Sequence, residues 1–180
     1  GVDVGRKRDL TVFWVVEEVG EDFWTRRVLE LDRRPFSEQR EAIFSLIAET
    51  GPRRVCFDAT GLGMQLAEEA VQAFGTYRVE PVTFSLHVKE DLATTLRRAF
   101  EDRRVRIPVD RRIREDLHSV KRVVTSAGNV RFDAERSEDG HADRFWALAL
   151  ALHAGSSPVG GPIAYERVAL RRAAFEAGCF

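Results

Sequence analysis

The chain has 180 residues, 44% of them hydrophobic and 32% charged, and its formal net charge at pH 7 is −1. This composition is typical of one soluble globular domain and excludes a disordered chain. Its longest apolar run, residues 147–152, is too short to cross a membrane, and no secretory signal precedes the first strand-like residues, so we expect no membrane partner and no secretion. The two cysteines, Cys56 and Cys179, form neither a disulfide framework nor a zinc-ligand spacing, which favours a reducing compartment.

The first part of the chain predicts an antiparallel meander of three strands. Residues 2–5 read as the end of a strand, residues 10–19 are rich in β-branched and aromatic side chains, and residues 23–31 alternate after a turn. A helix follows, with Ser37 as its expected N-cap and Gly51 just past its end.

The middle of the chain alternates strands and helices. Residues 54–58 carry consecutive apolar side chains, as in a central parallel strand. The elements expected after it are a helix over 64–74, a strand over 79–84, a helix over 89–103 and a helix capped by Asp110.

The last part predicts a β-hairpin and one more helix. Residues 122–125 and 130–133 flank a turn, and an apolar helix runs from about 141 to 153. We expect residues 1–155 to form one domain and residues 156–180 to form a linker and a C-terminal tail with a helical pattern.

This order of elements predicts an α/β fold: a mixed sheet of three antiparallel strands followed by parallel strands, flanked by helices, with an added β-hairpin. It is the order of the RNase H-like fold. The first strand and the strand that ends at Asp58 are expected to be neighbours in the middle of the sheet.

Three distant aspartates are predicted to meet on this fold. Asp3 lies on the first strand, Asp58 ends its expected neighbour, and Asp143 starts a helix that must pack on the sheet. Carboxylates favour hard cations such as Mg²⁺ or Mn²⁺, and two such ions activate water for phosphodiester hydrolysis. Taken alone, each residue also fits a turn, a helix cap or a first-turn acid that stabilises the helix dipole.

Four motifs resemble the nuclease domain of the large terminase subunit of tailed phages. They are Gly-Val-Asp-Val-Gly with a later Asp9, Phe-Asp-Ala-Thr-Gly-Leu-Gly over 57–63, Thr-Ser-Ala-Gly-Asn-Val-Arg-Phe over 125–132, and Gly-His-Ala-Asp-Arg-Phe-Trp-Ala-Leu-Ala-Leu-Ala over 140–151. The resemblance covers about residues 1–155. It implies an RNase H-like endonuclease that cuts concatemeric double-stranded viral DNA during genome packaging.

The resemblance also implies roles and partners. Asp3, Asp58 and Asp143 take the metal-ligand positions for two divalent cations, Mg²⁺ or Mn²⁺; Asp9 is a secondary acid that holds metal-bound water, and His141 is an auxiliary. The family's packaging ATPase domain is absent, because no Gly-x-x-x-x-Gly-Lys-Ser/Thr occurs, and a portal and a small terminase subunit are expected partners in the host cytoplasm.

Several basic residues are candidate DNA contacts. Lys89 starts a helix and is a candidate auxiliary at the scissile phosphate. The other candidates are Lys121, Arg122 and Arg131 on the hairpin, and Arg104 and Arg106 in an arginine run. A solvated surface or a hairpin used only for packing explains each of them as well. Gly61 and Gly63 either bind phosphate at a helix N-terminus or let the chain turn tightly beside Asp58.

Other readings stay open at this point. A junction resolvase or integrase would share the chemistry but act on another substrate. An actin-like ATPase or sugar kinase also opens on a Gly-x-Asp-x-Gly hairpin, although it needs a second, duplicated domain. A module that binds DNA or docks on a motor without catalysis is the alternative of a different class.

Overall fold

The computed structural model describes residues 1–5, 10–124, 130–134 and 142–156. Its strands are β1 (Val2–Asp3), β2 (Leu10–Val19), β3 (Asp22–Asp32), β4 (Val55–Asp58), β5 (Val79–Val82), β6 (Val105–Arg106), β7 (Val120–Val124) and β8 (Val130–Ala134). Its helices are α1 (Phe36–Thr50), α2 (Leu62–Phe74), α3 (Leu86–Glu101), α4 (Arg111–Ser119) and α5 (Asp143–Ser156). None of the described helices is long and apolar enough to cross a bilayer.

Six strands form one mixed sheet in the order β5-β4-β1-β2-β3-β6, and β7 and β8 pair separately as an antiparallel hairpin. The β1-β2-β3 meander is antiparallel, whereas β4 pairs parallel with β1 and β5 pairs parallel with β4. The predicted mixed sheet, the added hairpin and the adjacency of the first strand to the Asp58 strand are therefore confirmed.

Two details differ from the prediction. Ser37 is not the N-cap of α1: the helix begins at Phe36, and the capping position is Pro35, which makes no side-chain cap hydrogen bond. Residues 105–106, for which the sequence predicted no strand, form β6, a sixth strand that pairs parallel with β3. Two residues are too few to show a strand period, so this pairing depends on the tertiary fold.

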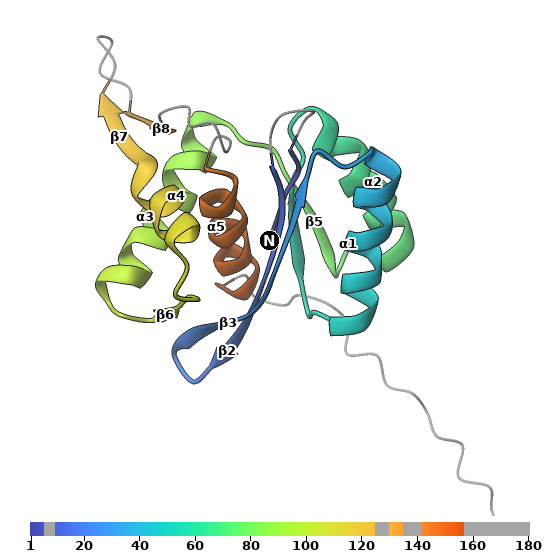
Figure 1. The fold of residues 1–180 in the computed structure, drawn as a ribbon, viewed down its shortest axis with the longest axis horizontal. Coiled ribbons are helices and arrows are strands. Elements are labelled where there is room, and N and C mark those ends of the chain that lie inside the picture. Colours follow the sequence, from blue (N-terminus) through green and yellow to red (C-terminus); the bar gives the residue numbers. More distant parts are fainter. Residues whose placement is uncertain (6–9, 125–129, 135–141, 157–180) are drawn as a thin grey trace, which may run out of the picture.

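Helices cover both faces of the sheet, α1 and α2 on one and α3, α4 and α5 on the other (Figure 1). Successive strand residues point to opposite faces, and two separate apolar cores result. The core under α1 and α2 includes Val2, Phe13, Ile43, Phe57 and Leu66. The core around α5 includes Val12, Trp14, Cys56, Leu96 and Leu148.

Helix α5 is buried on all sides, because it lies between the sheet and the outer helices α3 and α4. Every residue from Asp143 to Leu152 is buried. This explains why the sequence of α5 is apolar around its whole circumference instead of along one stripe. A carboxylate and a guanidinium at its first two positions therefore stand in the protein interior and need partners there.

A candidate metal site at one end of the sheet

Asp3 and Asp58 lie side by side on adjacent strands. In the parallel β1-β4 pair, Val2 is opposite Phe57, so Asp3 and Asp58 follow at the same level. Val2 and Phe57 pack in the core under α1 and α2, and Cys56 packs in the core around α5. Strand alternation therefore directs both aspartates toward α5.

Asp143 reaches the same end of the sheet from α5. Its Oδ2 accepts a buried hydrogen bond of 2.8 Å from the backbone N–H of Leu10, at the start of β2. Leu10 is two residues from Val12, which pairs with Asp3. The register thus brings the three predicted carboxylates to one face and one end of the sheet, with Asp3 and Asp143 only 7% and 6% exposed.

Their role as metal ligands remains a prediction. The carboxylate ligands of two ions about 3.5–4 Å apart lie farther from one another than the ligands of a single ion do. In the described part of the chain, the group whose potential ligand atoms all lie within 4.8 Å of one another is a different one, formed by Cys56, Glu80 and His153.

Asp58 stands in an electrostatic environment that suits a cation. Burial raises the pKa of its carboxyl, while hydrogen bonds from Thr60 and the charge of Lys89 oppose that rise. Thr60 donates its backbone N–H to Asp58 Oδ1 at 2.8 Å. Burial has the larger effect, and a divalent cation bound beside the carboxylate would stabilise its ionised form.

Lys89 lies near this group, as its effect on the pKa of Asp58 indicates. Its Nζ is 4.8 Å from the centroid of the Trp146 ring and 5.3 Å from that of Phe84. Trp146 is one helical turn after Asp143, so these contacts place Lys89 beside the start of α5. A contact between Lys89 and a scissile phosphate remains a prediction.

The glycines after β4 serve the tight turn beside Asp58. Gly61 is the N-cap of α2, with a positive φ of 66° that favours glycine. A Cβ placed on Gly63 would lie 1.9 Å from the backbone oxygen of Asp58, far inside van der Waals contact. Gly63 is thus required by the close approach of α2 to the end of β4.

A Gly63→Ala variant is expected to displace the backbone of Asp58 and to reduce metal-dependent DNA cleavage by about 10-fold or more, at a stability cost of about 1–3 kcal/mol. Plasmid-nicking rates and thermal unfolding measure both effects. The control is Gly20→Ala, which strains the backbone through its positive φ of 64° but places a Cβ that meets nothing within 4 Å. Equal loss of activity in both variants would contradict a local effect on Asp58.

The hairpin candidates for DNA binding lie at the same end of the molecule as the start of α5 (Figure 1). Lys121, Arg122 and Arg131 are all exposed on β7 and β8, which project beyond the sheet. Their exposure would allow contact with DNA, and this contact remains a prediction.

Arg104 and Arg106 lie at the other end. Arg106 is on β6 and Arg104 precedes this strand, which pairs with the first residues of β3, roughly 20 Å along β3 from the level of Asp3. Arg104 Nε donates to the backbone oxygen of Glu21 at 2.6 Å, and Arg106 forms a 2.9 Å ion pair with Asp22. DNA bound at the aspartates reaches them only if it extends along the sheet, so their role also remains a prediction.

The sequence-predicted positions Asp9 and His141 lie outside the described residues, as does Asp139, whose part in the site the sequence left open. The predicted C-terminal tail from residue 157 onward lies outside them as well.

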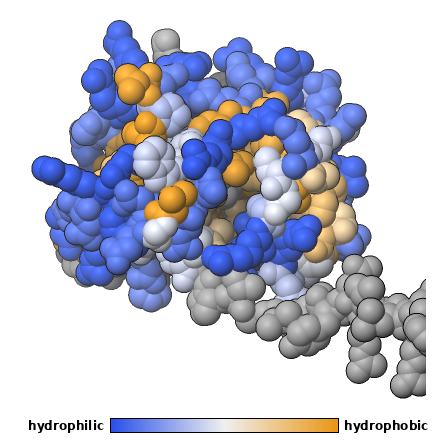
Figure 2. Space-filling view, turned by 90° about the horizontal axis from the view of Figure 1, so that it is seen from below, coloured by the Kyte–Doolittle hydropathy of each residue, from blue (hydrophilic) through white to orange (hydrophobic). Residues whose placement is uncertain are grey.

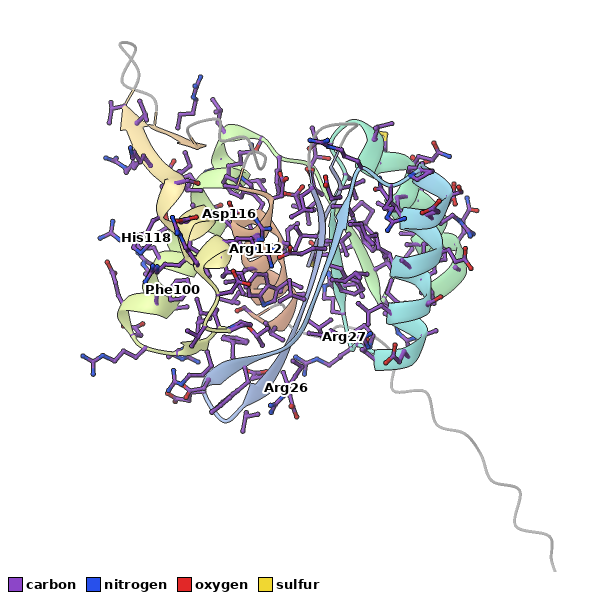
Figure 3. All side chains as sticks on the ribbon, in the orientation of Figure 1. Arg26, Arg27, Phe100, Arg112, Asp116 and His118 are labelled. Atoms are coloured by element: carbon purple, nitrogen blue, oxygen red, sulfur yellow. The ribbon has the colours of Figure 1, made fainter. Side chains whose placement is uncertain are left out.

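Sequence reasoning missed a buried network of ion pairs around Arg144, the residue that follows Asp143 on α5. Arg144 is 4% exposed, and its guanidinium donates to both carboxylate oxygens of Glu30, at 2.7 and 3.0 Å, and to Asp116 Oδ2 at 3.0 Å. Glu30 is on β3 and Asp116 on α4, where Figure 3 labels it, so one side chain joins three elements. A charged residue inside an apolar helical run was the available signal.

A cavity of about 570 Å³ lies at the end of the sheet away from the aspartates. Apolar side chains such as Val15, Phe23 and Ala151 line it together with Glu17 and Arg26. Figure 2, seen from below, shows apolar patches interrupted by hydrophilic ones on this side of the molecule. None of the three aspartates lines this cavity, so it is not the candidate catalytic site.

Comparison with known proteins gives a consistent result. A family model described as the terminase RNaseH-like domain matches residues 1–154. The Mu-like prophage FluMu protein gp28 of Haemophilus influenzae is 32% identical over 173 residues, which cover 91% of this chain and 32% of that protein. The large terminase subunit of Thermus virus P23-45 is 31% identical over 154 residues, which cover 84% of this chain and 30% of that protein. The chain thus spans about a third of the length of these relatives.

Solved structures agree with this. The large terminase nuclease of thermophilic phage G20c with bound magnesium superimposes with a TM-score of 0.72 at 28% identity, covering 85% of this chain and 78% of that one. The same nuclease has also been solved with bound cobalt and with bound zinc. The RNase H-like fold predicted from the order of elements is thereby confirmed.

Proposed function

Because the chain belongs to the terminase RNase H-like domain family, whose model matches residues 1–154, we propose that it is a metal-dependent endonuclease that cleaves double-stranded concatemeric viral DNA during genome packaging. The observation that carries the proposal is the register that sets Asp3 beside Asp58 while Leu10 holds Asp143 at the same end of the sheet. The bound magnesium, cobalt and zinc of the G20c nuclease support a divalent-cation cofactor.

The three carboxylates fit such ions by their donor chemistry. All of their ligand atoms are oxygens, the type that Mg²⁺ and Mn²⁺ prefer. Burial raises the pKa of the Asp58 carboxyl, and a bound cation would favour its ionised form. Two bound ions would lower the pKa of an attacking water and stabilise the leaving oxygen of the phosphodiester.

The protein's own contribution is to hold the carboxylates in place before DNA arrives. Thr60 fixes Asp58 through its backbone N–H, and the N–H of Leu10 fixes Asp143. Each of these hydrogen bonds orients its carboxylate relative to the sheet. Lys89 sits near enough to Asp58 to steer a phosphate toward the site.

Relatives about three times as long imply further partners. We include in the proposal a packaging ATPase domain of the same subunit, a portal and a small terminase subunit, with the host cytoplasm as the place of action. The chain matches only about a third of the length of each of these relatives.

The proposal is tested with supercoiled plasmid and the 180-residue chain. In Mn²⁺ or Mg²⁺ we expect nicked and then linear DNA, and a chelator should abolish both products. Absence of metal-dependent nicking would contradict the proposal and favour a DNA-binding or motor-docking module without catalysis. Preferential cutting of a four-way junction over linear duplex would favour a junction resolvase instead.

A further inference from the structure

A second cluster of metal-binding side chains lies on the same face of the sheet as the aspartates, farther from the start of α5. Cys56 on β4 and Glu80 on β5 are cross-strand partners, and His153 approaches them from α5. Their potential ligand atoms all lie within 4.8 Å of one another. Asp143 is ten residues before His153 on α5, a separation of about 15 Å along the helix.

The separation between His153 and Glu80 matches that between two ligands of a tetrahedral ion, and the Cys56 thiol contacts the other oxygen of the same carboxylate. Cys56 Sγ is 3.5 Å from Glu80 Oε2, and His153 Nε2 is 3.3 Å from Glu80 Oε1. Ligands of a tetrahedral zinc ion, with bonds of 2.0–2.3 Å, are separated by roughly 3.3–3.6 Å. Small side-chain adjustments would therefore be enough to enclose an ion.

Arg54 holds the carboxylate of this cluster in position. It donates from Nε to Glu80 Oε2 at 2.9 Å and makes a second hydrogen bond to the same oxygen from Nη2. Glu80 Oε1, which faces His153, receives neither of these hydrogen bonds. A carboxylate ligand fixed through its other oxygen is the usual arrangement around protein-bound metals.

We propose that Cys56, Glu80 and His153 form a separate site for a borderline-soft divalent cation such as Zn²⁺ or Co²⁺. Sulfur, imidazole and carboxylate ligands together select such ions over Mg²⁺, which prefers oxygen ligands. Three protein ligands leave a fourth position for water. Cys56 is fully buried, and a metal ion binds the thiolate, so the entering ion must displace the thiol proton into solvent.

A bound ion would join α5 to the hydrogen-bonded strands β4 and β5. β5 is an edge strand of the sheet, β4 carries Asp58, and α5 carries Asp143 at its other end. The ion would thus fasten the helix and the strand that supply two of the candidate catalytic aspartates. We expect Zn²⁺ to raise the melting temperature of the protein, and the rise should grow with the logarithm of the Zn²⁺ concentration above the Kd.

Cobalt spectroscopy tests this site apart from the aspartates, and its outcome does not depend on nuclease activity. In a Cys179→Ser background, Cys56 is the only cysteine of the chain. Titration with Co²⁺ should then produce a thiolate-to-cobalt charge-transfer band and the strong visible bands of four-coordinate Co²⁺. Oxygen ligands at the aspartates give no thiolate band. Absence of the band would overturn the proposal and leave a hydrogen-bonded cluster.

Variants and competing ions test the ligand set. We expect His153→Ala to weaken Co²⁺ binding by about 10-fold or more and Cys56→Ser, a nearly isosteric change, to abolish the band. His118→Ala, on α4 and outside the cluster, is the matched control and should bind Co²⁺ like the parent. Zn²⁺ should bleach the band, whereas Mg²⁺ should not. Unchanged affinity in His153→Ala, or displacement of Co²⁺ by Mg²⁺, would overturn the assignment.

Discussion

An Asp58→Asn variant is expected to nick plasmid DNA about 10³-fold more slowly than the parent and to keep its fold. A bound metal ion contributes several kcal/mol of transition-state stabilisation. The neutral amide of asparagine binds the ion too weakly to keep it in the site, so this contribution is lost. The Asn side chain is nearly isosteric, and its oxygen can still accept the N–H of Thr60. Asp91→Asn, an exposed aspartate on α3, is the control and should cleave like the parent.

The stability of the same variant should change in the opposite direction when metal is absent. Burial raises the pKa of Asp58 in the folded protein, so the unfolded chain loses this proton at lower pH. Folding stability therefore falls as pH rises from the unfolded to the folded pKa, and the ionised carboxylate destabilises the metal-free fold at neutral pH. Asp58→Asn should raise the metal-free melting temperature at pH 7 by about 1–3 °C, with no gain below the unfolded pKa.

Calorimetric melting with and without Mg²⁺ separates the two roles of Asp58. Magnesium should raise the melting temperature of the parent and have little effect on the variant. A large loss of metal-free stability in Asp58→Asn would mean that this carboxylate supports the fold instead of binding cations. Undiminished nicking by the variant would overturn the proposed mechanism.

The sequence predicted those elements of the fold that a pattern of neighbouring residues identifies. Three such features appear in the structure: the strands β2 and β3, the strand of consecutive apolar residues before Asp58, and the Asp110 cap of α4. From these elements, the adjacency of β1 and β4 follows by the handedness of the crossover, and with it the proximity of Asp3 and Asp58.

Other features depend on contacts between residues far apart in the chain, which no local pattern shows. The pairing of β6 with β3 joins segments about 80 residues apart. Cys56, Glu80 and His153 have no characteristic spacing, because cross-strand register and helix packing bring them together. At the start of α5, the sequence pattern pointed to Asp143 and not to its neighbour Arg144. The structure shows that Arg144 is the more deeply buried of these two charged residues.

Removal of the Arg144 side chain is expected to cause a large loss of stability, because Arg144 is a buried cation with two carboxylate partners. In Arg144→Met, Asp116 and Glu30 would lose their buried cation, and we expect a loss of about 3–5 kcal/mol, or a melting temperature lower by about 6–15 °C. Because the N–H of Arg144 also bonds Asp116, the start of α5 and Asp143 should loosen with it. Denaturant unfolding and metal affinity measure the two effects.

The loss should depend on pH in a direction set by Asp116. Burial raises the pKa of its carboxyl and Arg144 opposes that rise, so without Arg144 the folded pKa moves higher. A raised folded pKa means that stability is lost as pH rises through it, hence Arg144→Met should be less damaging in mild acid than at pH 8. An Arg144→Met, Asp116→Leu double variant should recover part of the loss, since no buried charge then remains on α4 at this position.

Arg112→Met is the matched control, because Arg112 also contacts Glu30, at 3.7 Å, but is 61% exposed (Figure 3). A solvated ion pair contributes little, so we expect a change below about 1 kcal/mol. Similar losses in the two variants would mean that burial does not strengthen the Arg144 network. If Arg144→Met instead kept its stability and lost metal affinity, the network would act mainly on the position of Asp143, and the start of α5 would be held by its apolar contacts alone.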